Sequence, residues 1–283
     1  MSALAWRGFA SASLSTLLAL QLCGCVNPAD RAAHFAGRHQ LSGAVIEGAG
    51  YRHEIFTRSS SPPGVLYVFI DGDGSPWVRG GMQVASDPTP ASTLALELAT
   101  QTPHSVLYLG RPCYFHVRRD SGCSPEVWTS ARYSDRVVES MAAAINRYTA
   151  ASGFFELVLI GYSGGGTLAV LIAPRVPATR AVVTIAANLD VAAWVRRHGY
   201  LPLDESLDPS TQPPLPDSLP QWHLVAGHDR NVPAHISRSY LERIPPERIW
   251  RYADFDHTCC WVEQWHEIFA RLEIALRDTG SIH

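Results

Sequence analysis

The sequence predicts an α/β protein with a mostly parallel central sheet and helices on both faces. From Gly64 onward, short apolar runs typical of buried strands alternate with amphipathic segments of helical length. Residues that favour turns, mainly glycine, proline and aspartate, follow several of these runs and mark the ends of the strands. Strands that alternate with helices in this way are joined by helical crossovers and therefore lie parallel in one sheet.

The expected strands are short, and the expected helices have apolar residues at helical spacing. The strands are expected at 65–70, 105–109, 157–160, 181–186, 222–226 and 248–252. The helices are expected at 92–100, 134–148, 165–173, 191–197 and 261–277. Ser134 is a suitable N-cap for the second helix. Residues 31–58 are expected to add antiparallel strands at one edge, and residues 71–90 to form turns.

Composition excludes several kinds of site. The chain has 283 residues and a net charge of −3, and all 23 residues counted as Lys+Arg are arginine. Without lysine there is no Schiff-base lysine, no phosphate-binding loop ending in GK[ST] and no Ser–Lys dyad. No basic cluster is long enough to indicate a nucleic-acid partner. The length favours one main domain.

The first 25 residues have the features of an export signal. Arg7 provides a positive charge before the apolar stretch 9–22. The following Leu22-Cys23-Gly24-Cys25 resembles the lipobox of bacterial lipoproteins, in which the chain is cleaved before the last cysteine and lipid is attached to its thiol. An ordinary cleaved signal and a buried helix are the alternatives. We expect an exported protein of the bacterial cell envelope, anchored by lipid in the periplasm or at the outer membrane.

Behind the signal, the chain divides into an N-terminal segment, 26–63, which holds the edge strands, and a main domain, 64–283. Within the main domain, the stretch 188–220 begins like a helix and then becomes rich in proline. We expect it to form a small lid-like insertion over the carboxyl edge of the sheet. A surface loop that contacts no ligand is the alternative.

Four cysteines remain after Cys25, and an exported protein can oxidise them. Cys113 and Cys123 flank a short loop-like stretch, so we favour a disulfide between them. Cys259 and Cys260 could form a vicinal disulfide, remain two buried thiols or pair with separate partners. No CxxC spacing supports a zinc site.

The strongest chemical signal is the pentapeptide Gly161-Tyr162-Ser163-Gly164-Gly165, a GxSxG motif. The apolar strand 157–160 leads directly into it and a helix of small residues leaves it. On such a sharp strand-to-helix turn the serine hydroxyl is exposed, and the glycines let neighbouring backbone pack closely. The alternative is a glycine-rich turn with a solvated serine.

With this motif the chain resembles the α/β-hydrolase family, from Gly64 to the C-terminus. The family places nucleophile, acid and base in that order along the chain. Residues 226–233, Ala-Gly-His-Asp-Arg-Asn-Val-Pro, lie further along the chain than Ser163 and come at the end of an expected strand. This position resembles the acid loop of the family and nominates Asp229 as the acid. His257 lies between the last strand and the last helix, where the family has its base. Asp190 is the alternative acid. The resemblance implies that His257 activates Ser163 while Asp229 orients the imidazole.

The resemblance also implies an oxyanion hole with two backbone donors. Gly164 would supply one N–H, and the turn after the first buried strand would supply the other, from Asp73 or from Gly74. Asp71 stands where the family often has histidine, which is a departure. Two carboxylates beside an oxyanion site must point away or meet positive charge. The turn lacks the glutamate that would complete a calcium loop. Because the triad requires no metal and no ligand spacing supports one, we expect neither a metal nor a cofactor.

Other residues near the expected strand ends are candidates for the substrate pocket. Trp77, Tyr162 and Trp194 could form apolar walls, although aromatic residues lie more often in a core. Arg111 follows the second strand and could either line the pocket or pair with a carboxylate of the turn.

The function that these residues imply is that of a serine hydrolase, which cleaves an ester, amide or thioester of a small-molecule acyl substrate through an acyl-enzyme. A carboxylic ester is the favoured bond. Acyl transfer on the same triad is one alternative. A catalytically silent envelope lipoprotein that binds a ligand or partner is another. The sequence leaves the substrate and the oligomeric state open.

Overall fold

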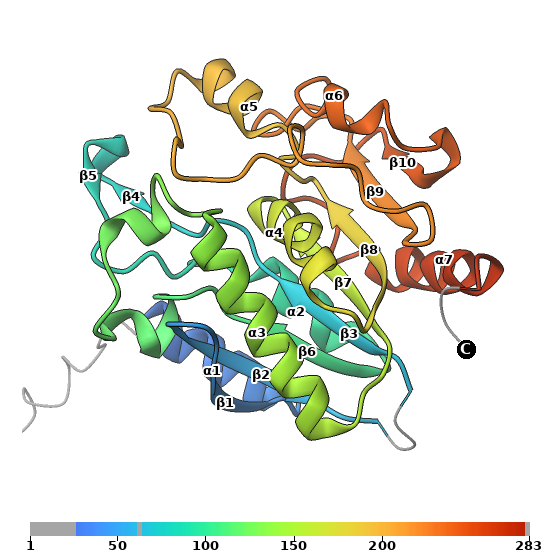
Figure 1. Ribbon diagram of the computed structural model, residues 1–283, viewed down its shortest axis with the longest axis horizontal. Coiled ribbons are helices and arrows are strands. Elements are labelled where there is room, and N and C mark those ends of the chain that lie inside the picture. Colours follow the sequence, from blue (N-terminus) through green and yellow to red (C-terminus); the bar gives the residue numbers. More distant parts are fainter. Residues whose placement is uncertain (1–26, 61–63, 281–283) are drawn as a thin grey trace, which may run out of the picture.

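An eight-stranded sheet runs through the centre of the molecule (Figure 1). The computed structural model describes residues 27–60 and 64–280. Along the sheet the order is β1-β2-β6-β3-β7-β8-β9-β10. The strands are β1 (Ser42–Glu47), β2 (Arg52–Arg58), β3 (Leu66–Ile70), β6 (Ser105–Leu109), β7 (Leu157–Tyr162), β8 (Thr179–Ile185), β9 (Gln221–Ala226) and β10 (Ile249–Tyr252). All neighbours from β6 to β10 pair in parallel, whereas β1 and β2 are antiparallel, which confirms the predicted fold class.

Helices cover both faces of this sheet. The α-helices are α1 (Pro28–Arg38), α2 (Leu94–Gln101), α3 (Asp135–Ser152), α4 (Gly164–Ile172), α5 (Val191–His198), α6 (Arg238–Leu241) and α7 (Trp265–Asp278). Figure 1 shows α3 and α4 on one face, with α2 and α7 on the other. Short 3₁₀ turns lie at Arg79–Gly81, Phe115–Arg119, Pro125–Trp128, Ala173–Arg175 and Pro246–Arg248.

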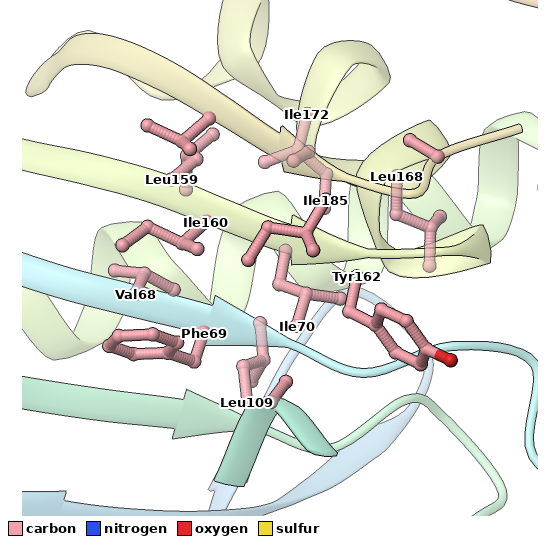
Figure 2. Packing of buried hydrophobic residues seen from close by; sticks show 14 of the residues in the cluster. Val68, Phe69, Ile70, Leu109, Leu159, Ile160, Tyr162, Leu168, Ile172 and Ile185 are labelled. Carbon is pink, nitrogen blue, oxygen red and sulfur yellow. The ribbon is translucent and has the colours of Figure 1, made fainter. Parts of the chain in front are cut away.

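The core lies between the central strands and the helices on either side. Every residue of β3 and β7 is buried, as expected for continuous apolar runs covered on both faces. Figure 2 shows Leu168 and Ile172 of α4 beside Ile185 of β8, with side chains of β3 and β7 stacked below them. This rigid centre positions the carboxyl ends of the strands, where the candidate residues lie.

The N-terminal segment corrects one prediction. Residues 28–38, which overlap the range expected to hold only edge strands, form α1 instead. The Asn27 side chain accepts a hydrogen bond from Asp30 N at 2.8 Å, and Pro28 occupies the first helical position, so the local sequence favours a helix start. The later part of the range does form β1 and β2.

The predicted export signal, including Cys25, lies outside the described residues. Within 27–60 and 64–280, none of the helices combines the length and the apolar character needed to cross a bilayer.

Two further elements differ from the sequence prediction. The stretch 71–90, expected to be turns, contains a small hairpin of β4 (Trp77–Val78) and β5 (Gln83–Val84). The last helix begins at Trp265 rather than 261. Trp261 itself is fully buried, and its Nε1 donates to the carbonyl of His257 at 3.2 Å. This hydrogen bond stabilises the segment between β10 and α7 as a turn.

The described cysteines form two disulfides. Cys113 joins Cys123, with their Cα atoms 5.5 Å apart, and Cys259 joins its neighbour Cys260. The second pair follows His257 closely in the chain.

Candidate active site

Ser163 occupies the turn between β7 and α4. Its φ of 52° and ψ of −123° are unusual for a residue with a side chain. A Cβ at Gly161 would lie 2.2 Å from the carbonyl oxygen of Gly165, and one at Gly165 would lie 2.2 Å from that of Ile70. Because these contacts are with backbone, only glycine fits at both positions. The two glycines of the motif therefore permit the tight turn that projects Ser163.

Three side chains from three sheet-edge loops form a hydrogen-bonded chain. Nε2 of His257 lies 3.1 Å from Oγ of Ser163, and its Nδ1 lies 2.7 Å from Oδ2 of Asp229. Asp229 is buried and follows β9, while His257 follows β10. Parallel strands end at the same edge of a sheet, so residues far apart in sequence meet there. The structure thus brings together the predicted nucleophile, acid and base.

Backbone donors hold the carboxylate of Asp229. Its Oδ1 accepts from the N–H groups of Asn231 at 2.8 Å and Val232 at 2.7 Å, which leaves Oδ2 directed at the imidazole. Asp190, the alternative acid, caps α5 instead, since its Oδ1 accepts from Ala193 N at 2.8 Å. This geometry favours Asp229 over Asp190.

Asn231 is a residue at the site that sequence reasoning missed. Its Nδ2 lies 3.0 Å from Nε2 of His257, the same atom that faces Ser163. Its carbonyl accepts from Nε1 of Trp194 at 3.1 Å, and Nε2 of His198 lies 2.7 Å from the same oxygen. Both of these side chains belong to α5, so the insertion is attached to the loop that carries Asp229. The only sequence signal for Asn231 is its position two residues after the acid.

The turn after β3 lies directly against the nucleophile. A Cβ at Gly72 would be 3.3 Å from Cβ of Ser163. In the described part of the chain, the N–H groups of Asp73 and Gly74 have no hydrogen-bond acceptor. The carbonyl of Asp73 accepts from the hydroxyl of Tyr114 at 2.8 Å. Donors near a reacting serine with no acceptor of their own are suited to stabilise an oxyanion.

The carboxylate of Asp73 lies in a cluster of arginine and tyrosine side chains beside the cavity. It accepts from Nη1 of Arg111 at 2.5 Å, from Nη1 of Arg132 at 2.8 Å and from the hydroxyl of Tyr133 at 2.8 Å. Burial alone would raise its pKa, but the charges of Arg132 and Arg111 outweigh burial and lower the pKa to about 2. The carboxylate of Asp73 is therefore ionised, and the two arginines balance its charge.

Of the two roles expected for Arg111, the structure shows the pairing with a carboxylate of the turn and not the pocket lining. Arg111 is buried, and its guanidinium binds Asp73 and the carbonyl of Arg132 rather than facing the cavity. The arginine that does line the cavity is Arg132, which belongs to no recognisable motif. Its contact with Asp73 joins positions 59 residues apart in sequence, so no local pattern could have indicated it.

Asp71 is neutralised in a different way. It is buried, the hydroxyl of Tyr108 lies 3.3 Å from its Oδ2, and the N–H of Gly72 lies 3.1 Å from its Oδ1. Burial raises its pKa to about 7, against smaller effects of these hydrogen bonds. Near neutral pH the second carboxylate is thus partly protonated.

A cavity of about 1120 Å³ opens in front of Ser163 and His257. Trp77, Tyr162 and Trp194 line it, as expected, together with residues of the turn after β3 and of the insertion. Within the described residues, no group of three or more His, Cys, Asp or Glu side chains is arranged to hold a metal ion.

Solved structures of similar architecture carry the names of hydrolases. A membrane phospholipase A, described as a bacterial virulence factor, matches at 17% identity over 89% of this chain and 92% of its own, with a TM-score of 0.54. An esterase of Pyrococcus furiosus matches at 12% identity over 87% and 95%, with a TM-score of 0.60. A Xanthomonas campestris protein, described as an α/β serine hydrolase without a lid, matches at 11% identity over 84% and 94%, with a TM-score of 0.50.

No model of a known protein family matches the chain, and no curated protein is similar to it in sequence. The identities to the solved structures are low, so the likeness concerns the fold. The parallel sheet, the helices on both faces and the strand-to-helix turn at Ser163 agree with that likeness. The chain therefore has the fold of the α/β-hydrolase superfamily.

Proposed function

We propose that the protein is a serine hydrolase that cleaves a carboxylic ester through an acyl-enzyme on Ser163. The observation that carries the proposal is the hydrogen-bonded chain from Ser163 through His257 to Asp229, at the floor of an open cavity. A serine hydroxyl is a weak nucleophile unless a base within hydrogen-bond reach removes its proton. The 3.1 Å separation of Oγ and Nε2 meets that requirement.

In the first step, Oγ of Ser163 attacks the carbonyl carbon while its proton passes to Nε2 of His257. The carbonyl π electrons move to oxygen and form the oxyanion. Asp229, bonded to Nδ1, holds the imidazole in the tautomer that can accept this proton and stabilises the imidazolium that results. Collapse of the intermediate expels the alcohol, which takes the proton from His257, and leaves the acyl group on Ser163.

The N–H groups of Gly164 and Asp73 are the proposed oxyanion donors. Gly164 is the first residue of α4, so its N–H has no acceptor within the helix and lies at the positive end of the helix dipole. The N–H of Asp73 is held in place through the Tyr114 hydroxyl and the buried carboxylate cluster. Fixed donors of this kind stabilise developing charge without reorganising during the reaction.

In the second step, water replaces the alcohol. His257 removes a proton from the water, the resulting hydroxyl group bonds to the acyl carbon, and Ser163 leaves with the proton that His257 returns. The reaction releases a carboxylic acid and restores the enzyme. The esterases and the phospholipase A among the similar structures support an ester as the bond that is cleaved.

A fluorophosphonate probe tests the proposal, because it phosphonylates only an activated serine. The protein should be labelled, and Ser163→Ala should abolish labelling. Ser130→Ala is the matched control, since Ser130 lines the same cavity but its hydroxyl bonds Glu205 instead of a histidine. Equal labelling of the parent and Ser163→Ala, or no labelling of the parent, would contradict the proposal.

Product analysis separates hydrolysis from the alternatives. Release of free acid from an acyl ester, with no product formed from added alcohols or amines, supports the hydrolase. Transfer to such an acceptor with no free acid would favour an acyltransferase. Absence of both reactions from a folded, unlabelled protein would favour a silent binding protein.

We also propose that the protein works in the bacterial cell envelope, anchored by lipid on Cys25. The support is the lipobox-like sequence that ends at this residue. Mass spectrometry of the mature N-terminus tests this: a diacylglyceryl group on Cys25 is expected, and an unmodified N-terminus would contradict it.

A further inference from the structure

Large apolar side chains gather on two loops at the mouth of the Ser163 cavity. Eight such side chains are exposed among the described residues, and five of them belong to these loops. The hairpin β4–β5 carries Trp77, Val78 and Met82, and the segment after α5 carries Tyr200 and Leu201. We call these five residues the apolar rim. Exposed apolar groups that cluster around an opening usually mark an interaction site, whereas scattered ones do not.

Both loops of the apolar rim border the cavity itself. Trp77 and Val84 of the hairpin, and Tyr200 and Leu201 of the other loop, are among the residues that line it. Figure 1 shows the hairpin and α5 at the same end of the molecule, over the carboxyl ends of the strands. A surface that covered the apolar rim would therefore lie over the entrance to the cavity.

One side of the apolar rim is held in place by ring contacts. The Tyr200 ring stacks on His198, with centroids 5.1 Å apart, and meets Trp194 edge-on at the same distance. Trp194 and His198 in turn contact the carbonyl of Asn231, in the loop that carries Asp229. Leu201 follows directly and is 77% exposed. Tyr200 and Leu201 thus belong to a segment that ring contacts and hydrogen bonds hold in place.

Three exposed arginines flank the apolar rim. Arg79 lies in the hairpin, and Arg196 and Arg197 end α5; all three are exposed and have no carboxylate partner in the described part of the chain. Residues 77–84 and 191–203 contain no Asp or Glu, although the whole chain has a net charge of −3. Acidic residues border the second segment. Asp190 accepts from Ala193 N at 2.8 Å, Asp208 from Ala192 N at 2.9 Å and Glu205 from the Ser130 hydroxyl at 2.7 Å, whereas none of the three arginines has a carboxylate partner among the described residues.

We propose that the apolar rim docks the cavity mouth onto an anionic lipid surface. Tryptophan, tyrosine and methionine side chains would enter the boundary between headgroups and acyl chains, and the three arginines would meet lipid phosphates. Apolar residues flanked by arginine have the composition that such a surface selects, because arginine keeps its charge among the headgroups while its neighbours are buried. Docking goes beyond the hydrolytic step and does not depend on it.

Brominated lipids test the docking, since they quench tryptophan emission only when the ring reaches the acyl region. The full chain is mixed with brominated vesicles of phosphatidylglycerol in phosphatidylcholine, and with vesicles of phosphatidylcholine alone. The signal of Trp77 is the difference between the parent and Trp77→Phe. We expect this signal to be quenched on the anionic vesicles and weakly or not at all on the neutral ones.

Substitutions with matched controls locate the contact. Met82→Asp should raise the lipid needed for half-maximal quenching by about tenfold or more, because a large apolar side chain no longer enters the bilayer. Phe155→Asp is its control: Phe155 is 82% exposed, against 84% for Met82, but precedes β7 at the opposite edge of the sheet. Arg197→Glu should raise the lipid requirement by about fivefold or more on anionic vesicles. Arg147→Glu, an exposed arginine of α3, is the control for the change in charge.

All variants keep the same residues 1–26, so any vesicle binding through that segment is common to all of them. Equal quenching of the parent and Met82→Asp, or an equal loss in Phe155→Asp, would overturn the proposal. Absence of quenching from a parent that is dimeric, and becomes monomeric in Met82→Asp, would overturn it in favour of a second copy on the apolar rim. The readout needs no catalysis, so the docking and the hydrolase proposals fail independently.

Discussion

Replacing Asp73 by asparagine tests the buried charge cluster behind the proposed oxyanion site. In the parent, the carboxylate lies between Arg111 and Arg132 and accepts from the Tyr133 hydroxyl. Asparagine has nearly the same shape, but it carries no charge and presents an NH₂ group to side chains that are themselves donors. The substitution therefore leaves two buried guanidinium groups with no anion between them.

The pKa of Asp73 sets the magnitude of the effect. Folding lowers it from 3.8 to about 2, and each pKa unit corresponds to about 1.4 kcal/mol of preference for the charged form. Leaving buried charges without their partner costs about 3 to 5 kcal/mol in other proteins. We expect Asp73→Asn to lower the free energy of unfolding by about 3 kcal/mol at neutral pH. Because folding lowers the pKa, this stabilisation is present above pH 3.8 and is lost as the pH falls toward 2.

Urea unfolding followed by tryptophan fluorescence measures the loss. Asp120→Asn is the control, since Asp120 pairs with Arg52 at the surface, where solvent screens the pair and its loss should have little effect on stability. The reasoning would be refuted if Asp73→Asn unfolded at the same urea concentration as the parent, or if both variants lost the same amount. A loss of esterase turnover larger than the change in KM would further show that the cluster supports the transition state.

Three other substitutions probe the turn, the titrating carboxylate and the disulfide. Gly165→Ala should lower the free energy of unfolding, measured with urea, by about 1 to 3 kcal/mol, because its Cβ would lie 2.2 Å from the carbonyl oxygen of Ile70 in β3. Gly37→Ala is the control and should not lower it, because no atom lies within 4 Å of a Cβ at that position. Asp71→Asn should become more stable relative to the parent as the pH rises from 4 to 7, on the order of 1 kcal/mol per pH unit. Burial raises the pKa of this carboxyl to about 7, so the parent must lose its proton on unfolding, and a pH-independent difference would contradict this. Replacing Cys113 and Cys123 by serine should lower stability by about 2 to 3 kcal/mol, and added reductant should then have no further effect on this loop.

Local patterns predicted the strands and the nucleophile turn well. The strand at 105–109 has the predicted bounds, and Ser134 occupies the N-cap position of α3, although its hydroxyl makes no capping hydrogen bond. These bounds depend on neighbouring residues, since a buried strand needs an unbroken apolar run and an amphipathic helix needs apolar residues at helical spacing. The small hairpin within 71–90 was missed because its two-residue strands are too short to show an alternating pattern. Helix α1 was missed although Asn27 and Pro28 are suited to a helix start, since the range from residue 31 was assigned to edge strands.

The sequence by itself determined the fold class, and its GxSxG motif, with the resemblance to the α/β-hydrolase family, pointed to Ser163, Asp229 and His257. Each of these residues follows a strand, and parallel strands end at one edge of the sheet. Only the tertiary structure decided how the two carboxylates of the turn are accommodated: Asp73 lies between arginines, and burial raises the pKa of Asp71. It also decided that Asn231 contacts His257 and that two distant loops form the apolar rim. These contacts join residues tens of positions apart, and their energies depend on burial and charge in three dimensions, which no spacing along the chain records.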